Sequence, residues 1–375
     1  MRLSAIVPVY NGGAYLPAFF ESLAAAAVEG MQLIIVDDGS TEAVGPVFPD
    51  RGPYSDVRIV TNATNLGYAT AVNRGVALAD GEIIVQLNTD LLLRPDCLHA
   101  LIRGLVSKPR AGIVGSKLVF PTTGRIQHAG MAFGRWSRRH IFFDMPADHP
   151  LCRTRRLQMM TGAVAALTRP VLDRLGPLDE GYYNSNEDVD HCLRAARLGL
   201  ENWLFADSVA YHWVSQSGPA RFAGIREADA LFWSNWGEER SVDLGEFVAE
   251  AIEYILSVRP DAAAFPFVPL DLTRSADHRI LLDEIERFWP GAGDRTVSRR
   301  VRPHGDGSLR LPMLLPHWTV RSTAPFIYLV DRLSDLTENR LWFETRLGLV
   351  DEEILLDTTG AIYLASVFLA ERVGR

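Results

Sequence analysis

The sequence predicts an α/β protein, with a Rossmann-like, mixed and mostly parallel sheet flanked by helices in its N-terminal part. Two observations indicate this class. Short apolar runs of strand length alternate with segments whose apolar residues recur at helical spacing. Several of the apolar runs end in small clusters of Asn, Asp and Gly, which are typical of the turns that follow strands in such sheets.

The composition is that of a folded protein and argues against a nucleic-acid-binding or membrane-spanning one. The chain has 375 residues, 47% of them hydrophobic, and a net charge of −8, so we expect more than one domain and no nucleic-acid partner. Three scattered cysteines indicate reduced thiols in a cytosol. No apolar run approaches about 18 residues and no signal-peptide pattern is present, so we expect a cytoplasmic protein without a transmembrane segment.

The elements of the first 90 residues follow from these patterns in order. Helical spacing of apolar residues predicts helices at 14–27 and 67–79. Strands and helices in this rhythm imply parallel strands joined by crossover helices. Short apolar runs followed by turn residues predict strands at 3–9, 33–36, 57–60 and 82–87.

Polar side chains follow three of these strands: Asn11, then Asp37 and Asp38, then Asn88 and Asp90. The carboxyl ends of parallel strands lie at one edge of a sheet, so we expect these side chains to gather there. Each one alone could cap a helix, and for Asn11 we favour that role. Carboxylates gathered at one edge repel one another, so the set as a whole favours a bound ligand or cation.

A further acidic cluster opens a helix predicted at 187–198. Glu187, Asp188 and Asp190 all lie in its first turn. Acids are favoured there by the helix dipole, but three in four residues exceed what capping requires. Mutual repulsion among them would raise the pKa of a carboxylate, and a raised pKa suits a general base.

We divide the chain into a first domain, residues 1–240, with halves at 1–90 and 91–240, and an extension at 241–375. Helical spacing at 247–256, 280–289 and 359–372 predicts a mainly helical extension. It could cap a cleft, influence the choice of acceptor or mediate self-association into a homo-oligomer.

Several motifs, in order, resemble the family-2 glycosyltransferases with the GT-A fold. The nucleotide-facing motifs are VPVYNGGAYL, IIVDDGS, NLGYATAVNRG and VQLNTD, and Met160–Ala163, Asn186–Arg194 and Tyr211-His212 resemble the acceptor half. The resemblance covers about residues 1–240. It implies an inverting, metal-dependent, rhamnosyltransferase-like enzyme.

The resemblance implies a nucleoside-diphosphate sugar donor, UDP- or dTDP-linked, at the strand ends. Asp38 would accept a hydrogen bond from the pyrimidine, and Asp37 could instead be a cap that fixes its loop. Asn73 could equally be a solvent-facing helix position. The donor-binding residues that it implies are Pro8, Val9, Tyr10, Asp38, Asn65, Gly67, Asn73, Asn88, Thr89 and Asp90.

Asn88-Thr89-Asp90 occupies the position of the family's Asp-x-Asp motif, with Asn in place of the first Asp. The resemblance implies that Asp90 and His212 hold a divalent cation, Mn²⁺ or Mg²⁺. Because Asn88 is not a carboxylate, the cation would depend on the donor diphosphate for affinity. His212 could alternatively be a buried core histidine.

The resemblance assigns Asp188 as the catalytic base, with Glu187 orienting the acceptor. Trp136 and Thr161-Gly162-Ala163 would line the sugar or acceptor pocket. The acceptor would be a glycan or a lipid-linked molecule in bacterial surface polysaccharide synthesis, with a peripheral contact to the inner membrane face left open. Arginines around Trp136 either bind an anionic acceptor or form a solvated loop. The competing functions are a catalytically weak sugar-nucleotide-binding module and a nucleotidyltransferase.

Overall fold

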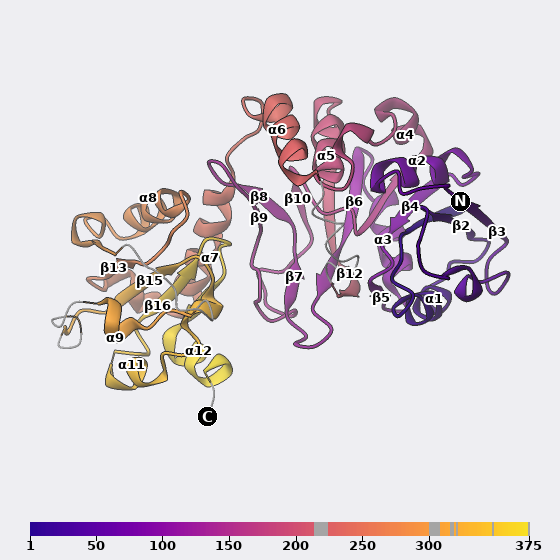
Figure 1. Ribbon diagram of the computed structural model, residues 1–375. Coiled ribbons are helices and arrows are strands. Elements are labelled where there is room, and N and C mark those ends of the chain that lie inside the picture. Colours follow the sequence, from indigo (N-terminus) through magenta and orange to yellow (C-terminus); the bar gives the residue numbers. More distant parts are fainter. Residues whose placement is uncertain (214–223, 300–307, 316–318, 320–321, 347–348, 374–375) are drawn as a thin grey trace. The chain divides into compact units, whose positions relative to one another are not determined.

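The computed structural model describes residues 1–213, 224–299, 308–315, 319, 322–346 and 349–373 (Figure 1). They divide into two compact units. The first consists of Met1–Met131 and Pro146–Arg240, and the second of Ala132–Met145 and Ser241–Arg375. The predicted domain 1–240 differs from the first unit in one segment, because residues 132–145 group with the second unit.

Four strands of the first unit pair in parallel, as the sequence predicts. β1 (Leu3–Val9) lies between β2 (Gln32–Asp37) and β4 (Ile83–Leu87), and β3 (Asp56–Thr61) pairs with β2. Strands β1, β2 and β4 are buried along nearly their whole length. Burial on both faces explains why each reads as a continuous apolar run. The predicted α/β class is confirmed.

The crossover helices begin and end within a few residues of their predicted bounds. α1 spans Leu16–Ala25. It begins just before Pro17, because a residue that lacks an amide hydrogen fits only in the first turn of a helix. α2 spans Tyr68–Ala77 and follows Gly67 directly. The other elements of the first unit are η1 (Gly45–Val47), β5 (Leu91–Leu93), α3 (Cys97–Val106), β6 (Ala111–Val119), β7 (Ile126–His128), β10 (Arg155–Leu157), β11 (Val164–Thr168), α4 (Arg169–Leu175), η2 (Glu180–Tyr182), α5 (Glu187–Arg197), β12 (Glu201–His212) and α6 (Ile225–Trp236).

The sheet continues beyond β4 with mixed pairing. β11 pairs antiparallel with β4 and with β6, and β12 then runs parallel to β6. The end of β12 also pairs antiparallel with β5, so that His212 lies opposite Leu91. This pairing brings His212 next to the turn that follows β4, although the two are far apart in the sequence.

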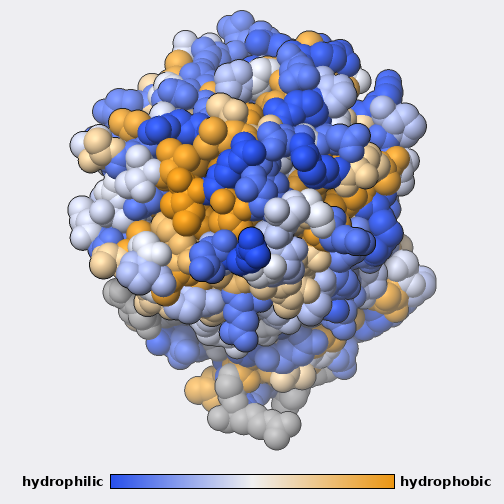
Figure 2. All heavy atoms as spheres, turned by 90° about the vertical axis from the view of Figure 1, so that its right-hand side faces the viewer, coloured by the Kyte–Doolittle hydropathy of each residue, from blue (hydrophilic) through white to orange (hydrophobic). Residues whose placement is uncertain are grey.

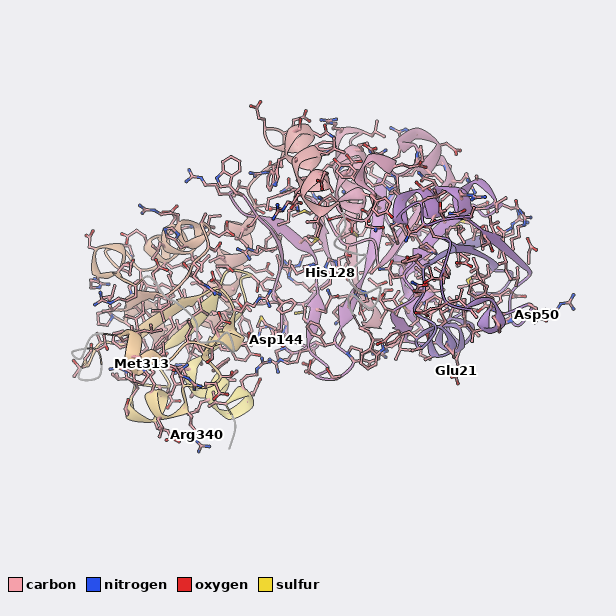
Figure 3. All side chains as sticks on the ribbon, viewed as in Figure 1. Glu21, Asp50, His128, Asp144, Met313 and Arg340 are labelled. Carbon is pink, nitrogen blue, oxygen red and sulfur yellow. The ribbon has the colours of Figure 1, made fainter. Side chains whose placement is uncertain are left out.

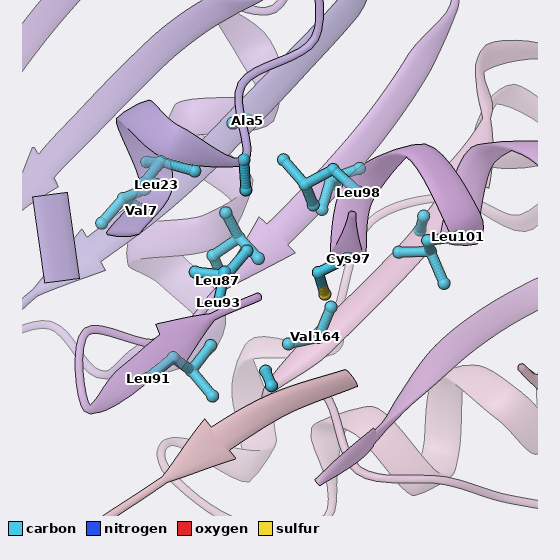
Figure 4. Close-up of a cluster of buried hydrophobic side chains, with 14 of the residues drawn as sticks. Ala5, Val7, Leu23, Leu87, Leu91, Leu93, Cys97, Leu98, Leu101 and Val164 are labelled. Atoms are coloured by element: carbon cyan, nitrogen blue, oxygen red, sulfur yellow. The ribbon is translucent and has the colours of Figure 1, made fainter. Parts of the chain in front are cut away.

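An apolar core beneath the sheet fixes these strand ends. Figure 4 shows part of it, where side chains from β1, β4, β5, α1 and α3 meet. Val7, Leu87, Cys97 and Leu98 are all fully buried. Burying an aliphatic side chain of this size stabilises a fold by about 1.5–3 kcal/mol. The residues that follow β1 and β4 therefore start from rigid positions.

The second unit contains a sheet of its own that the sequence did not predict. β13 (Val268–Asp271), β15 (Phe326–Val330) and β16 (Ile354–Asp357) pair in parallel. The helices predicted at 247–256 and 280–289 are confirmed. The remaining elements are α7 (Leu244–Val258), η4 (Pro260–Ala264), α8 (His278–Phe288), η5 (Gly293–Arg295), β14 (Val297–Ser298), α9 (Leu311–Leu314), η6 (Leu333–Leu336), α11 (Arg340–Thr345), β17 (Ile362–Leu364) and α12 (Ala365–Arg372).

The helix predicted at 359–372 is wrong in its first part. Gly360 has a φ of 77°, which is outside the helical region. The amides of Thr359 and Ala361 donate to the carboxylate of Asp357. The chain therefore turns, forms β17 against β16, and becomes helical only at Ala365.

Residues 132–145 are tied to the second unit through a hairpin. β8 (Met131–Phe133) pairs with β9 (Arg138–His140). The buried carboxylate of Asp277, just before α8, accepts hydrogen bonds from Arg135 N, Ser137 Oγ and Arg139 Nε at 3.1, 2.6 and 3.1 Å. Asp144, labelled in Figure 3, forms an ion pair with Arg372. A segment from the middle of the chain thus completes the second unit.

The surface near β3 is that of a sheet edge. Figure 2 views the molecule from this side, where hydrophilic residues cover most of the face and apolar residues form smaller patches. Ile59 on β3 is 48% exposed. No helix in the described part of the chain is long and apolar enough to cross a membrane.

A buried histidine in α5 should make the first unit sensitive to acid. Burial and the nearby charge of Arg194 lower the pKa of His191 from 6.5 to about 3. The unfolded chain binds this proton below about pH 6.5, whereas the folded chain does not until about pH 3. Stability is therefore lost as the pH falls through this window, by about 2 kcal/mol at pH 5 relative to pH 7.

We expect His191→Gln to show a smaller drop in melting temperature between pH 7 and pH 5 than the wild type. The matched control is His99→Gln, which changes an exposed histidine on α3. Equal drops in His191→Gln and the wild type would contradict this account.

Candidate active site

A cleft of about 160 Å³ opens in the first unit beside the carboxyl ends of β1, β2 and β4. Open α/β sheets bind ligands at this edge. Six separate stretches of chain contribute to it. The predicted site residues that line it are Pro8, Val9, Tyr10, Asp38, Asn65, Asn88, Thr89, Asp90, Thr161, Gly162, Ala163, Glu187 and Asp188.

Asp38 builds one wall of this cleft. Its carboxylate accepts hydrogen bonds from Asn62 Nδ2 at 2.6 Å and from the amides of Leu66 and Gly67, each at 2.9 Å. A carboxylate offers about four lone-pair sites, so these bonds leave little capacity for a base. Asp37 accepts from Ser40 N at 3.0 Å, which is the loop-fixing role considered above.

The start of α2 is already occupied by side-chain oxygens. The amides of Leu66 and Gly67 donate to Asp38, and the amide of Tyr68 donates to Asn184 Oδ1 at 2.9 Å. A helix N-terminus attracts anions through such amides. Here they hold the wall of the cleft together, so a phosphate could use them only by displacing these partners.

Gly67 does not line the cleft, but its backbone conformation and its close neighbours require glycine. Its φ is 94°, and an added Cβ would lie 2.6 Å from the ring of Tyr183 and 2.8 Å from its carbonyl oxygen. Gly67, predicted above as a donor-binding residue, therefore allows the loop and Tyr183 to approach closely.

We expect Gly67→Ala to destabilise the first unit more than Gly30→Ala. Both glycines have positive φ, but Gly67 combines it with a ψ of 161°, a region that is essentially restricted to glycine, and nothing lies within 4 Å of a Cβ at Gly30. The clash with Tyr183 should add about 1–3 kcal/mol. Thermal melting of the two variants checks this, and equal melting temperatures would argue against a tight contact at Gly67.

Asn73 lies outside the cleft lining. Its Nδ2 donates to the carbonyl of Leu178 and to Glu180 Oε1, both at 2.9 Å, and its Oδ1 accepts from Leu178 N at 3.0 Å. The side chain therefore anchors the segment before η2 to α2. The sequence left two possibilities for Asn73, a contact with the donor or a position facing solvent. In the structure its side chain does neither.

The turn after β4 carries an acceptor atom that lacks a partner. Asn88 N donates to Ala163 O at 2.9 Å, which holds this turn against the start of β11. Asn88 Oδ1 is buried and has no hydrogen-bond partner among the described residues. Leaving a buried acceptor unsatisfied costs about 1–3 kcal/mol. A hydroxyl group or a cation bound here would satisfy it.

Asp90 and His212 form the pair that the resemblance implies. Asp90 Oδ1 lies 3.1 Å from His212 Nε2, and His212 Nδ1 lies 3.2 Å from Gln127 Oε1. All three residues are buried. A carboxylate oxygen and an imidazole nitrogen suit Mn²⁺ or a similar ion.

Asp90 and His212 are placed so that they could serve as two ligands of one divalent cation. Two ligand atoms at about 2.1 Å from an ion, at a right angle, are about 3.0 Å apart, close to the separation of Asp90 Oδ1 and His212 Nε2. The described residues include no cluster of three or more His, Cys, Asp or Glu side chains that could hold a metal. Further ligands would come from Asn88 Oδ1, the substrate or water.

Asp188 reaches the same cleft from the first turn of α5. Its Oδ2 accepts from Gly162 N and its Oδ1 from Val189 N, both at 2.7 Å. A Cβ at Gly162 would lie 3.1 Å from Asp188 Cβ, so glycine allows this approach. Two amide donors thus hold the carboxylate in place at the cleft.

The three acids of this helix turn are separated by the fold. Glu187 is buried and lines the cleft beside Asp188. Asp190 points elsewhere, because it accepts from Arg194 Nε at 2.7 Å and from Trp236 Nε1 at 2.9 Å. Asp190 therefore holds α6 against α5, and two carboxylates remain at the cleft.

Trp136 is not one of the described residues that line the cleft. It belongs to the hairpin of the second unit and is 69% exposed. The basic residues around it do not form one patch in a single unit. Arg139 pairs with Asp277 in the second unit, and Arg156 pairs with Glu201 in the first.

Sequence reasoning missed some of the cleft lining. Tyr15 and Tyr68 bring aromatic rings to it, and Tyr15 also lies 6.4 Å from the ring of Trp213. Both tyrosines lie within recognised motifs, VPVYNGGAYL and NLGYATAVNRG, and that was the available signal, since a motif does not show which of its side chains will face a ligand. The missed residues are Gly12, Tyr15, Tyr68, Ala71 and Asn184.

Known proteins with similar sequences are mainly glycosyltransferases. The protein "Uncharacterized protein y4gI" of Sinorhizobium fredii is 32% identical over 57% of this chain and 25% of its own length. N-acetylglucosaminyl-diphospho-decaprenol L-rhamnosyltransferase of Mycobacterium tuberculosis is 26% identical over 54% of this chain and 72% of its own. O-antigen biosynthesis protein RfbC of Myxococcus xanthus is 28% identical over 64% of this chain. This chain spans only a quarter of y4gI and 19% of RfbC.

Solved structures show remote similarity. S. aureus TarS 1-349 in complex with UDP-GlcNAc matches with a TM-score of 0.47 and 15% identity, over 77% of this chain and 80% of TarS. The mannosyltransferase PcManGT from Pyrobaculum calidifontis, in complex with GDP-Man and Mn²⁺, matches with a TM-score of 0.43 and 18% identity, over 70% and 81%.

The family assignment rests on the sequence. The profile of the family described as "Glycosyl transferase family 2" matches residues 4–176. This range contains β1 to α4 and thus the cleft walls that carry Asp38, Asn88 and Asp90. The ordered motifs, the relatives and this match, which spans just under half of the chain, all support a family-2 glycosyltransferase.

Proposed function

We propose that this protein is an inverting, metal-dependent glycosyltransferase that moves a sugar from a nucleoside-diphosphate donor to a hydroxyl group of a glycan or lipid-linked acceptor. One observation carries the proposal. Asp188 on α5 lines the same cleft as Asp90, which is paired with His212. A fixed carboxylate beside a candidate cation site is the arrangement that transfer to a hydroxyl group requires.

The donor would lie along the strand ends. Pro8, Val9 and Tyr10 would bind the base, to which Asp38 would add only the acceptor site that its three hydrogen bonds leave, and the diphosphate would lie near Asp90. The unpartnered Asn88 Oδ1 supports a hydroxyl of the donor or the cation as its neighbour. Held by Asp90 and His212, a divalent cation would neutralise the charge on the departing diphosphate.

Asp188 would act on the acceptor. Its carboxylate takes the proton of the acceptor hydroxyl while that oxygen forms a bond to the anomeric carbon. The bond from this carbon to the diphosphate oxygen breaks, and the nucleoside diphosphate leaves from the opposite face. The amides of Gly162 and Val189 keep the carboxylate in place during this step. Glu187 would orient the acceptor.

The finer assignment rests on relatives. The relative from Mycobacterium tuberculosis is named as an L-rhamnosyltransferase, and the one from Myxococcus xanthus as an O-antigen biosynthesis protein. We therefore favour a UDP- or dTDP-linked donor and a role in bacterial surface polysaccharide synthesis.

A donor screen tests the proposal. Thermal melting with Mn²⁺ and a panel of UDP- and dTDP-sugars should show a rise in melting temperature for the true donor, because a ligand that binds only the folded state stabilises it. The release of nucleoside diphosphate then reports transfer or hydrolysis. If no donor raises the melting temperature and none is cleaved, the protein is not this enzyme.

The same screen separates the two competing functions. A binding module would show the thermal shift without any release of nucleoside diphosphate. A nucleotidyltransferase would instead form a sugar nucleotide and pyrophosphate from a sugar phosphate and a nucleoside triphosphate.

A further inference from the structure

Gln127 stands behind the candidate metal ligand His212. It lies at the centre of β7, which pairs antiparallel with β6, and is 7% exposed. Its Oε1 is 3.2 Å from His212 Nδ1. The next residue, His128, is labelled in Figure 3. The resemblance gives Gln127 only a place in a turn before the acceptor cleft, and the mechanism above does not use its side chain.

The contact constrains where the imidazole carries its proton. An amide oxygen can only accept a hydrogen bond, so Nδ1 must donate the hydrogen. In a neutral imidazole the other nitrogen, Nε2, then carries a lone pair. Nε2 is the atom that lies 3.1 Å from Asp90 Oδ1. In the neutral imidazole two acceptor atoms therefore face each other, and a metal cation or a further proton between them would make this contact favourable.

Without the amide oxygen the opposite tautomer would be favoured. Nε2–H would donate directly to the Asp90 carboxylate, and Nε2 would lack the lone pair that a cation needs. A metal ion would then have to break that bond before binding. The position of one amide oxygen thus decides whether Asp90 and His212 form a closed pair or an open site.

We propose that Gln127 is a positioning residue that fixes the Nδ1–H tautomer of His212 and thereby keeps Nε2 available to a divalent cation. The inference rests on the proposed metal-assisted function. Partners of this kind typically contribute 10- to 100-fold to metal affinity, so we expect a loss of about this size when the oxygen is removed.

The test compares Gln127→Met with Gln127→Glu. Methionine has a similar length without the acceptor oxygen, whereas glutamate keeps an oxygen that can accept from Nδ1. Mn²⁺ binding is measured by electron paramagnetic resonance at pH 8 with UDP present, which requires no turnover. We expect about 10- to 100-fold weaker Mn²⁺ binding in Gln127→Met and affinity within about threefold of the wild type in Gln127→Glu.

A second readout reports the tautomer itself. Long-range ¹H–¹⁵N spectra of the protein without metal distinguish Nδ1–H from Nε2–H imidazoles, and His212→Ala identifies the signal. We expect the Nδ1–H form in the wild type and in Gln127→Glu, and the Nε2–H form in Gln127→Met. A merely structural role for Gln127 would lower the melting temperature without changing the tautomer.

The outcomes separate this inference from the proposed function. If the wild type binds no Mn²⁺ in the presence of nucleotide, the proposed metal-assisted function fails. If the wild type binds Mn²⁺ and Gln127→Met binds it equally with an unchanged tautomer, only the role of Gln127 is overturned.

Discussion

Replacing Asp188 with asparagine should lower the rate of sugar transfer by about 10²- to 10⁴-fold, the usual contribution of a general base. Asparagine has nearly the same shape, and its carbonyl oxygen can still accept one of the two amide hydrogens. It cannot take a proton from the acceptor. Donor binding, measured by the melting-temperature shift, should stay within about threefold of the wild type because Asp188 acts on the acceptor.

The control for this variant is Asp190→Asn, the same change two residues along α5. Asp190 pairs with Arg194 and Trp236 and does not line the cleft. It should lower the melting temperature but keep the rate per folded molecule. A wild-type rate in Asp188→Asn would remove Asp188 from the mechanism, and a donor-binding defect of the same size would assign it to the donor instead.

Replacing Asp90 with asparagine should abolish activation by Mn²⁺ and lower transfer by about 10³-fold, since a cation at a departing diphosphate contributes several kcal/mol. The change keeps the size of the side chain and removes the charge that faces His212. Treating the wild type with a chelator should give a similar loss, which added Mn²⁺ reverses. In Asp90→Asn added Mn²⁺ should restore little.

Asn88→Asp provides the change in the opposite direction. It places a second carboxylate at the unpartnered position of Asn88 Oδ1, so Mn²⁺ should bind more tightly in the absence of nucleotide. Titration of Mn²⁺ without nucleotide measures this. Full activity of the chelated wild type would contradict metal dependence, whatever the variants do.

The sequence predicted some site residues better than others: those at strand ends, the acid on α5, and the asparagine on α2 differ. The strand ends carrying Asp38 and Asp90 could be predicted, because the turn residues after buried strands leave a local signal. The position of Asp188 came from the resemblance, since its helix has no local relation to β4. Asn73 matched a motif, yet its amide anchors the segment at Leu178, and a motif cannot show which way a helix faces.

The second unit shows the same limit. The spacing at 247–256 and 280–289 predicted helices correctly because their apolar faces repeat. β15 and β16 are buried along their whole length and lack alternation, so their short apolar runs could not be told from buried helix segments. Residues 132–145 join this unit through Asp277, a contact with no trace in nearby sequence.

The sequence by itself determined the α/β class, the parallel strands at the nucleotide-facing edge and the family, since these depend on local periodicity and ordered motifs. Only the tertiary structure decided which polar groups meet. It committed Asp38 to the loop beside it, left Asn88 Oδ1 without a partner among the described residues, and placed Gln127 behind His212. The physical reason is that hydrogen-bond partners are set by strand pairing between distant segments, here β7, β12 and the turn after β4, and such pairing has no local signature in the chain.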